Sequence, residues 1–112
     1  SLSSVNPDSA IAILTAMKEK ITAENKQTQM YYQLICLKAK DKAYITHTSD
    51  SSILQILKYY EQKGEKKHLP EAYYYAGRVY RDLGDAPQAL DYYQKALDVS
   101  QSSKDYKLGS DY

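Results

Sequence analysis

Residues 70–101 read PEAYYYAGRVYRDLGDAPQALDYYQKALDVSQ, and this segment gives the clearest indication of the architecture. Apolar and aromatic residues recur at three- and four-residue steps on both sides of Leu83-Gly84-Asp85, which predicts two helices joined by a tight turn. Gly77 in the first helix and Ala89 in the second are small where two packed helices must approach to about 8–10 Å. Three rings are placed to fill the space around these small residues: Tyr73, Tyr80 and Tyr93.

The spacing in this stretch resembles the tetratricopeptide repeat. The matching pattern is Tyr73-x-x-Ala76-Gly77-x-x-Tyr80, then Leu83-Gly84-Asp85, then Ala89-x-x-x-Tyr93-x-x-Ala96-Leu97. It departs from the family at Tyr73 for Trp, Ala76 for Leu and Gln101 where Pro often stands. The alternative is an ordinary helical hairpin with small residues placed by chance, and the number of matching positions weighs against it. The resemblance implies an all-α, right-handed superhelix of about five antiparallel helices, whose concave groove binds a protein or peptide.

Three more helical segments precede this stretch. The first begins at Pro7, with Asn6 as its N-cap, and presents one apolar face for about 16 residues. The second spans 26–44, and the third runs from Ile53 to a stop at Gly64, a natural residue for a left-handed helix end. In the stretch itself we expect the last helix to close between residues 100 and 104.

Parts of the repeat pattern recur on both sides. Tyr31-x-x-Leu34-Ile35 is similar to the start of the pattern, and Tyr59-Tyr60 mirrors Tyr92-Tyr93 at a 33-residue offset. We therefore predict a degenerate repeat at 26–64, with a longer loop than in the well-matched repeat at 70–101. Residues 104–112 either begin a further repeat or form a polar tail. The whole of 1–112 is expected to be a single domain cut from a longer array, with apolar positions of the last helix left for self-association or for a homo-oligomer.

Composition supports the helical interpretation and excludes several classes of function. Four Gly and three Pro among 112 residues are too few for a turn-dense all-β domain. A formal net charge of +1 gives no field that would steer nucleic acid or acidic lipid. The lysines are interrupted by acidic residues and are not accompanied by an Arg–aromatic stacking pattern, so we expect a solvated face and no direct nucleic-acid binding. No apolar run approaches a membrane span, so we expect no membrane insertion by this segment.

No residue is nominated for catalysis. The chain lacks a Gly-rich phosphate loop, a His-Glu-x-x-His motif, a Cys-x-x-Cys pair and a Gly-x-Ser-x-Gly elbow. Cys36, the single cysteine, is expected to be a packed or half-buried thiol. His47 and His68 lie in polar turns and are expected to be solvated. We therefore predict a protein that is not an enzyme and holds no cofactor and no metal.

The resemblance also implies which residues line the groove. The register of the family places four candidates there: Tyr32, Tyr74, Arg78 and Arg81. In the same register Gln29, Cys36, Ala39 and Lys40 accompany Tyr32, and Glu71 and Asp82 accompany the other three. The alternative for Arg78 is an ion pair with Asp82, four residues on, on a solvated helix face.

Short motifs spread over nearly the whole chain resemble a group of bacterial membrane-associated tetratricopeptide regulators. These motifs lie at residues 6–10, 30–34, 38–42, 50–53, 59–61 and 73–80. The resemblance implies the interaction portion of a signalling or transcription-regulator protein, on the periplasmic side of the cell envelope and anchored by parts not present here. A cytoplasmic location is the alternative. The competing function is a structural spacer or dimerisation segment that holds a fused output domain.

Overall fold

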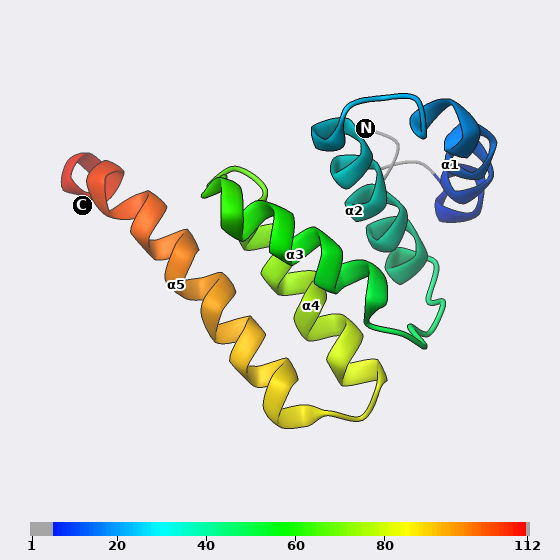
Figure 1. Ribbon diagram of the computed structural model, residues 1–112. Helices are drawn as coiled ribbons and strands as arrows, with labels where there is room; N and C mark the ends of the chain where they lie inside the picture. The colour runs from blue at the N-terminus through cyan, green and yellow to red at the C-terminus, as the bar shows by residue number, and fades with distance from the viewer. Residues whose placement is uncertain (1–5, 112) are drawn as a thin grey trace.

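The computed structural model describes the backbone of residues 6–111 and the side chains of residues 6–101. The described part contains five helices and no strand. They are α1 (Pro7–Ile21), α2 (Lys26–Lys42), α3 (Ser51–Lys63), α4 (Leu69–Asp82) and α5 (Ala86–Asp111). Figure 1 shows successive helices running back and forth, with α3, α4 and α5 side by side and α1 against the other side of α2. The expected all-α helical-repeat architecture is confirmed.

Local chemistry sets most of the helix boundaries. The Asn6 side chain accepts a hydrogen bond from the backbone N–H of Asp8, and Asn25 does the same for Thr28. Gly64 ends α3 with φ of 59° and Gly84 follows α4 with φ of 80°, a backbone region that other residues rarely adopt.

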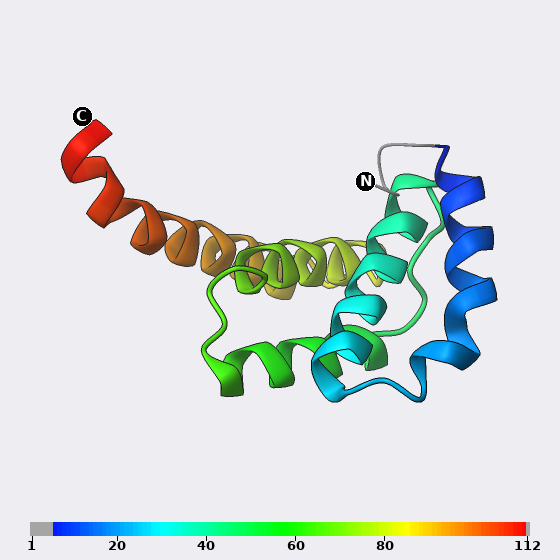
Figure 2. The same cartoon turned by 90° about the horizontal axis from the view of Figure 1, so that it is seen from above.

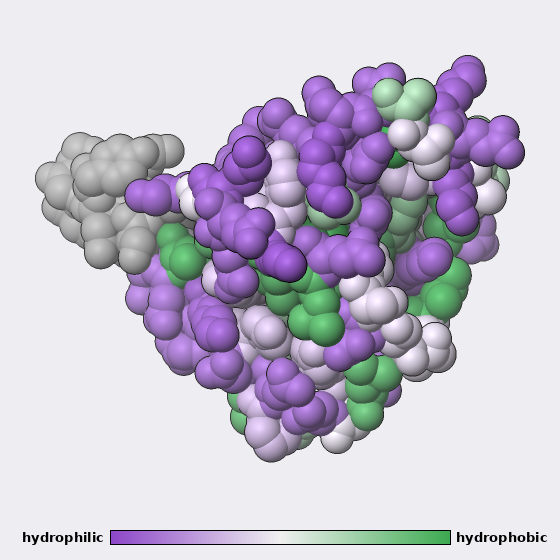
Figure 3. Space-filling model, in the orientation of Figure 1, coloured by the Kyte–Doolittle hydropathy of each residue, from purple (hydrophilic) through white to green (hydrophobic). Residues whose placement is uncertain are grey.

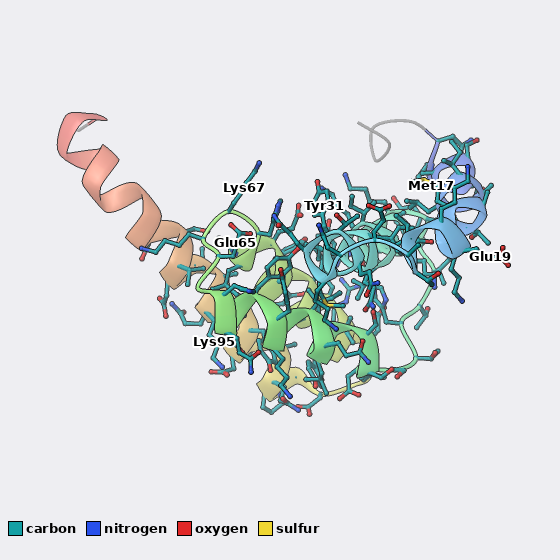
Figure 4. All side chains as sticks on the ribbon, turned by 45° about the horizontal axis from the view of Figure 1, so that its top comes forward. Met17, Glu19, Tyr31, Glu65, Lys67 and Lys95 are labelled. Carbon is teal, nitrogen blue, oxygen red and sulfur yellow. The ribbon has the colours of Figure 1, made fainter. Side chains whose placement is uncertain are left out.

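The start of α4 is capped from the preceding loop. The Glu65 carboxylate accepts hydrogen bonds from the backbone N–H groups of Lys67, at 2.6 Å, and His68, at 3.0 Å. A carboxylate in this place also suits the positive end of the helix dipole. The side chain of Lys67 points away from the protein, as Figure 4 shows.

The last helix is longer than expected. We predicted that it closes between residues 100 and 104, but α5 continues to Asp111. No Pro or Gly occurs between Pro87 and Gly109, so no residue forces the helix to stop earlier. The side chains from residue 102 onward lie outside the described part, so a further repeat at 104–112 stays a prediction.

Two apolar clusters use different sides of α2. The larger joins α2, α3 and α4, with Leu34, Ile53, Ile56 and Val79 fully buried at its centre. The smaller joins α1 to α2 around Leu14. Helix α2 is therefore the element that connects α1 to the rest of the protein. Figure 2 shows α1 beside α2 and α5 continuing beyond the ends of α3 and α4.

The pair α4 and α5 packs as the small residues predict. A Cβ atom built on Gly77 would lie 2.4 Å from the Cε1 atom of Tyr93, so the ring occupies the space that any other side chain would need. Ala76 and Ala89 are buried, and the ring of Tyr92 stacks on that of Tyr80 with centroids 5.6 Å apart. Helices α4 and α5 therefore approach each other closely at Gly77.

Candidate functional site

One face of α4 carries the side chains that the register assigned to a groove. Tyr74, Arg78 and Arg81 follow at steps of four and three residues, so they share one side of the helix. Tyr74 is 43 % exposed. Its ring meets that of Tyr75 edge-on with centroids 5.0 Å apart, and lies 5.8 Å from that of Tyr93. The aromatic ring is therefore held in place by two others while much of it stays open to solvent.

Arg78 pairs with Asp41 and not with Asp82, the partner considered from the sequence. Its Nε atom donates to both carboxylate oxygens of Asp41 on α2, each at 3.2 Å. This hydrogen bonding raises the pKa of Arg78, and burial opposes the rise. Asp82 instead accepts from Arg81, at 3.0 Å. The alternative of an Arg78–Asp82 pair is wrong, because α2 brings a carboxylate to the guanidinium from 37 residues away.

Asp41 and Asp82 also bind the loop between α2 and α3, through contacts with His47. His47 is only 9 % exposed, with Nε2 placed 3.1 Å from Oδ1 of Asp41. Its backbone N–H donates to Asp82 at 2.9 Å. Burial raises the pKa of Asp82, but this backbone donor and Arg81 outweigh burial and hold the pKa below its usual value. The expectation of a solvated His47 is wrong, because the loop lies against the ends of α2 and α4.

His68 is also packed. Its ring lies 4.6 Å from that of Tyr31 and 5.7 Å from that of Tyr60. The local sequence around His68 is polar and indicated a solvated turn, whereas both aromatic partners come from earlier helices. Tyr31 is marked in Figure 4.

Tyr32 lies on a different side of α2 from the residues that face α4. Two α2 side chains form polar contacts with α4: Lys38, whose Nζ lies 2.9 Å from Oε2 of Glu71, and Asp41, which pairs with Arg78. Tyr32 instead packs on the α1 cluster and donates its hydroxyl hydrogen bond to the carbonyl of Leu14. Tyr32 therefore belongs to the α1 side of α2, and its place in a binding groove stays a prediction.

Beside Tyr32 lies a cavity of about 480 Å³. Its walls come from α1, α2, the loop after α2 and the first turn of α3. Cys36 is one of the lining residues and is half-buried, as expected; burial raises the pKa of its thiol. Sequence reasoning missed this cavity, because its walls are four segments that only the packing of α1 and the loop brings together.

The described residues hold neither a group of metal ligands nor a helix suited to cross a membrane. No group of three or more His, Cys, Asp or Glu side chains there is arranged to hold a metal ion. None of the helices described here combines the length and apolar content that a membrane span needs. On the face shown in Figure 3, hydrophilic surface predominates and hydrophobic patches are small and separate.

A helix pair, α4 and α5, held by small-residue contacts and with an exposed aromatic ring on its first helix, defines this part of the chain as a helical-repeat module. A family model described as Tetratricopeptide repeat matches residues 70–102, which comprise α4, its turn and the first part of α5. The chain thus contains a tetratricopeptide repeat, a protein–protein interaction module. Comparisons with curated proteins and with solved structures found no match. The repeat predicted at 26–64 and the single-domain assignment of 1–112 stay predictions.

Proposed function

We propose that this chain is the protein-binding segment of a bacterial signalling or transcription-regulator protein, and that its partner docks on the exposed face of α4. The observation that carries the proposal is that the Tyr74 ring is exposed to solvent and yet fixed in position. A half-exposed ring already fixed against Tyr75 and Tyr93 loses little conformational freedom on binding. Tyr and Arg are the residue types that most often supply interface energy.

The two arginines on this face have separate roles. Arg81 has a side chain 49 % exposed and offers donors to a partner from the far end of the face. Arg78 is 25 % exposed and is held by Asp41, so it presents a fixed guanidinium edge one turn from Tyr74. A partner segment with a carboxylate near an apolar residue would fit this order of groups.

The regulatory role and the location are proposed from the motif resemblance. The motifs at residues 30–34, 38–42 and 73–80 support a place in the bacterial envelope, on the periplasmic side, with the anchor supplied by other parts of the parent protein. Labelling Cys36 in whole cells with a membrane-impermeant thiol reagent tests the location. Labelling only after the inner membrane is opened would instead place the segment in the cytoplasm.

A spacer or dimerisation segment is the second candidate, and one observation favours it. Leu90 is 68 % exposed and Leu97 is 56 % exposed, seven residues apart on α5. Two leucines at this spacing lie on one side of a helix, so they offer an apolar strip to another helix.

A pull-down with the double variant Tyr74→Ala/Arg81→Ala tests the docking proposal. Arg78 stays unchanged in this variant, because its removal would leave the carboxylate of Asp41 without its guanidinium. The matched control is Tyr44→Asn/Lys58→Ala, which also removes one exposed ring and one cation but lies off this face. Asn suits the positive φ of residue 44.

We expect the α4 variant to lose at least tenfold in affinity for a specific partner while the control keeps it. Both variants must first show the melting temperature of the parent. Retention of every partner by the α4 variant would move the docking site off this face and favour the spacer function.

A further inference from the structure

The cavity beside Tyr32 combines apolar side chains with short hydroxyl side chains. Leu14 of α1 and Leu37 of α2, both buried, form its apolar base together with the half-buried Ile11 of α1. Short hydroxyl side chains line its rim: Thr15, Thr46, Thr48, Ser49, Ser51 and Ser52. An apolar base with a few polar groups that fix orientation is the usual make-up of a ligand site, and about 480 Å³ lies in the usual size range.

The charge in the walls has one sign. Lys18 from α1 and Lys40 from α2 both line the cavity, whereas none of its lining residues is Asp or Glu. Neither ammonium group forms an ion pair with any carboxylate in the described part of the chain. The nearby Glu19 points away from the protein on the outer side of α1 (Figure 4).

The positive charges of Lys18 and Lys40 both act on the thiol of Cys36. Burial raises the pKa of the Cys36 thiol, and the neighbouring Tyr32 hydroxyl and the charges of Lys40 and Lys18 oppose that rise. Both ammonium groups are therefore close enough to Cys36 for their fields to overlap there. A carboxylate in the cavity would be attracted by two cations at once.

We propose that this cavity is a second docking site, which binds a short acidic segment of a protein partner with a carboxylate between Lys18 and Lys40 and an apolar side chain on Leu14. The choice of a protein segment rests on the proposed function of the chain. The two lysines call for a carboxylate on the bound segment, and the apolar base calls for an apolar side chain beside it. None of the residues that line the cavity lies on α4, so the site is separate from the face that carries Tyr74.

The single cysteine provides the readout. The rate at which the neutral reagent N-ethylmaleimide alkylates Cys36 is measured with and without a library of capped hexapeptides that carry two Asp or Glu residues among apolar ones. The matched library has Asn or Gln in their place. Hexanoate is the small-molecule arm. We expect the acidic library to slow alkylation at least fivefold and the amide library and hexanoate to slow it less than twofold.

Binding is then measured by fluorescence anisotropy with the best-protecting acidic hexapeptide. We expect Lys18→Gln/Lys40→Gln to raise its Kd at least tenfold. The control Lys58→Gln/Lys66→Gln removes the same charge from exposed positions outside the cavity and is expected to change Kd less than twofold. The Tyr74→Ala/Arg81→Ala variant is expected to bind the peptide normally, which separates this site from the α4 face.

Three results would overturn the proposal. These are an absence of protection by the acidic library, equal effects of the two lysine double variants, and protection by hexanoate as strong as that by the peptides. The last result would make the cavity a site for small carboxylates. Loss of partner binding at the α4 face leaves all three measurements unaffected, so the two proposals fail separately.

Discussion

Arg78 on α4 and Asp41 on α2 form a two-oxygen contact, in which the arginine Nε lies 3.2 Å from each carboxylate oxygen. The same carboxylate lies 3.1 Å from Nε2 of His47. Asp41 is only 9 % exposed in its side chain, so its carboxylate contacts Arg78 and His47 and little water. One carboxylate therefore holds together the end of α2, the following loop and α4.

Asp41→Asn is expected to destabilise the protein by about 1–3 kcal/mol, because a neutral amide cannot replace the charge-assisted bonds to Arg78. The free energy of unfolding in urea measures the effect. Asp91→Asn is the control, since Asp91 forms only an exposed pair with Lys95 and should change stability by less than about 0.5 kcal/mol. Equal urea midpoints for the two variants would show that the Asp41 contact adds nothing beyond a surface pair.

Gly77→Ala is expected to destabilise the protein by about 1–3 kcal/mol, because the new methyl group would overlap the ring of Tyr93. Helix propensity alone predicts the opposite sign, a gain of about 1 kcal/mol for Ala over Gly. Chemical denaturation therefore separates the two effects by sign. Combining Gly77→Ala with Tyr93→Leu should restore part of the loss, and a stabilised single variant would mean that α4 and α5 are not packed this closely.

Leu90→Gln/Leu97→Gln is expected to reduce self-association, since both side chains are exposed on one side of α5. Sedimentation equilibrium over a range of protein concentrations measures the change. Leu54→Gln serves as the control, because Leu54 is an exposed leucine on α3. A parent protein that stays monomeric at the highest concentration would contradict the prediction and would remove the support for a dimerisation segment.

Buried and half-buried tyrosines make stability sensitive to alkali. Burial is the largest cause that raises the pKa to about 12 in four of them: Tyr32, Tyr60, Tyr75 and Tyr80. The pKa of Tyr73 is raised as well, by burial and by its hydrogen bond to Glu61. A raised pKa means that the folded state favours the neutral phenol. Their contribution to stability is therefore complete below pH 10 and is lost as the pH rises from 10 towards 12.

Ultraviolet absorbance of tyrosinate checks this expectation. The native protein should ionise part of its tyrosine at higher pH than the same protein in concentrated urea, and its free energy of unfolding should fall across that range. Tyr80→Phe should reduce the fraction of tyrosine that ionises only at this higher pH. Coincident titration curves for the native and the urea-denatured protein would contradict it.

Local spacing was sufficient to predict the helices and the well-matched repeat. Helix periodicity, the Asn6 cap and the glycines at 64 and 84 are properties of neighbouring residues, so they are visible in the sequence. The contact of Gly77 with Tyr93 was predictable for the same reason, because a short turn fixes how two adjacent helices meet.

The sites depend on contacts between residues distant in the chain, and here the structure was needed. The partner of Arg78, the burial of His47 and the placement of Tyr32 against α1 follow from how α2 is rotated between its neighbours. That rotation is set by which of two apolar faces of α2 packs on α1 and which on α3 and α4. Periodicity shows that a helix has apolar faces, whereas only the packed partners determine what each face contacts, because burial energy depends on area and not on the identity of the neighbour.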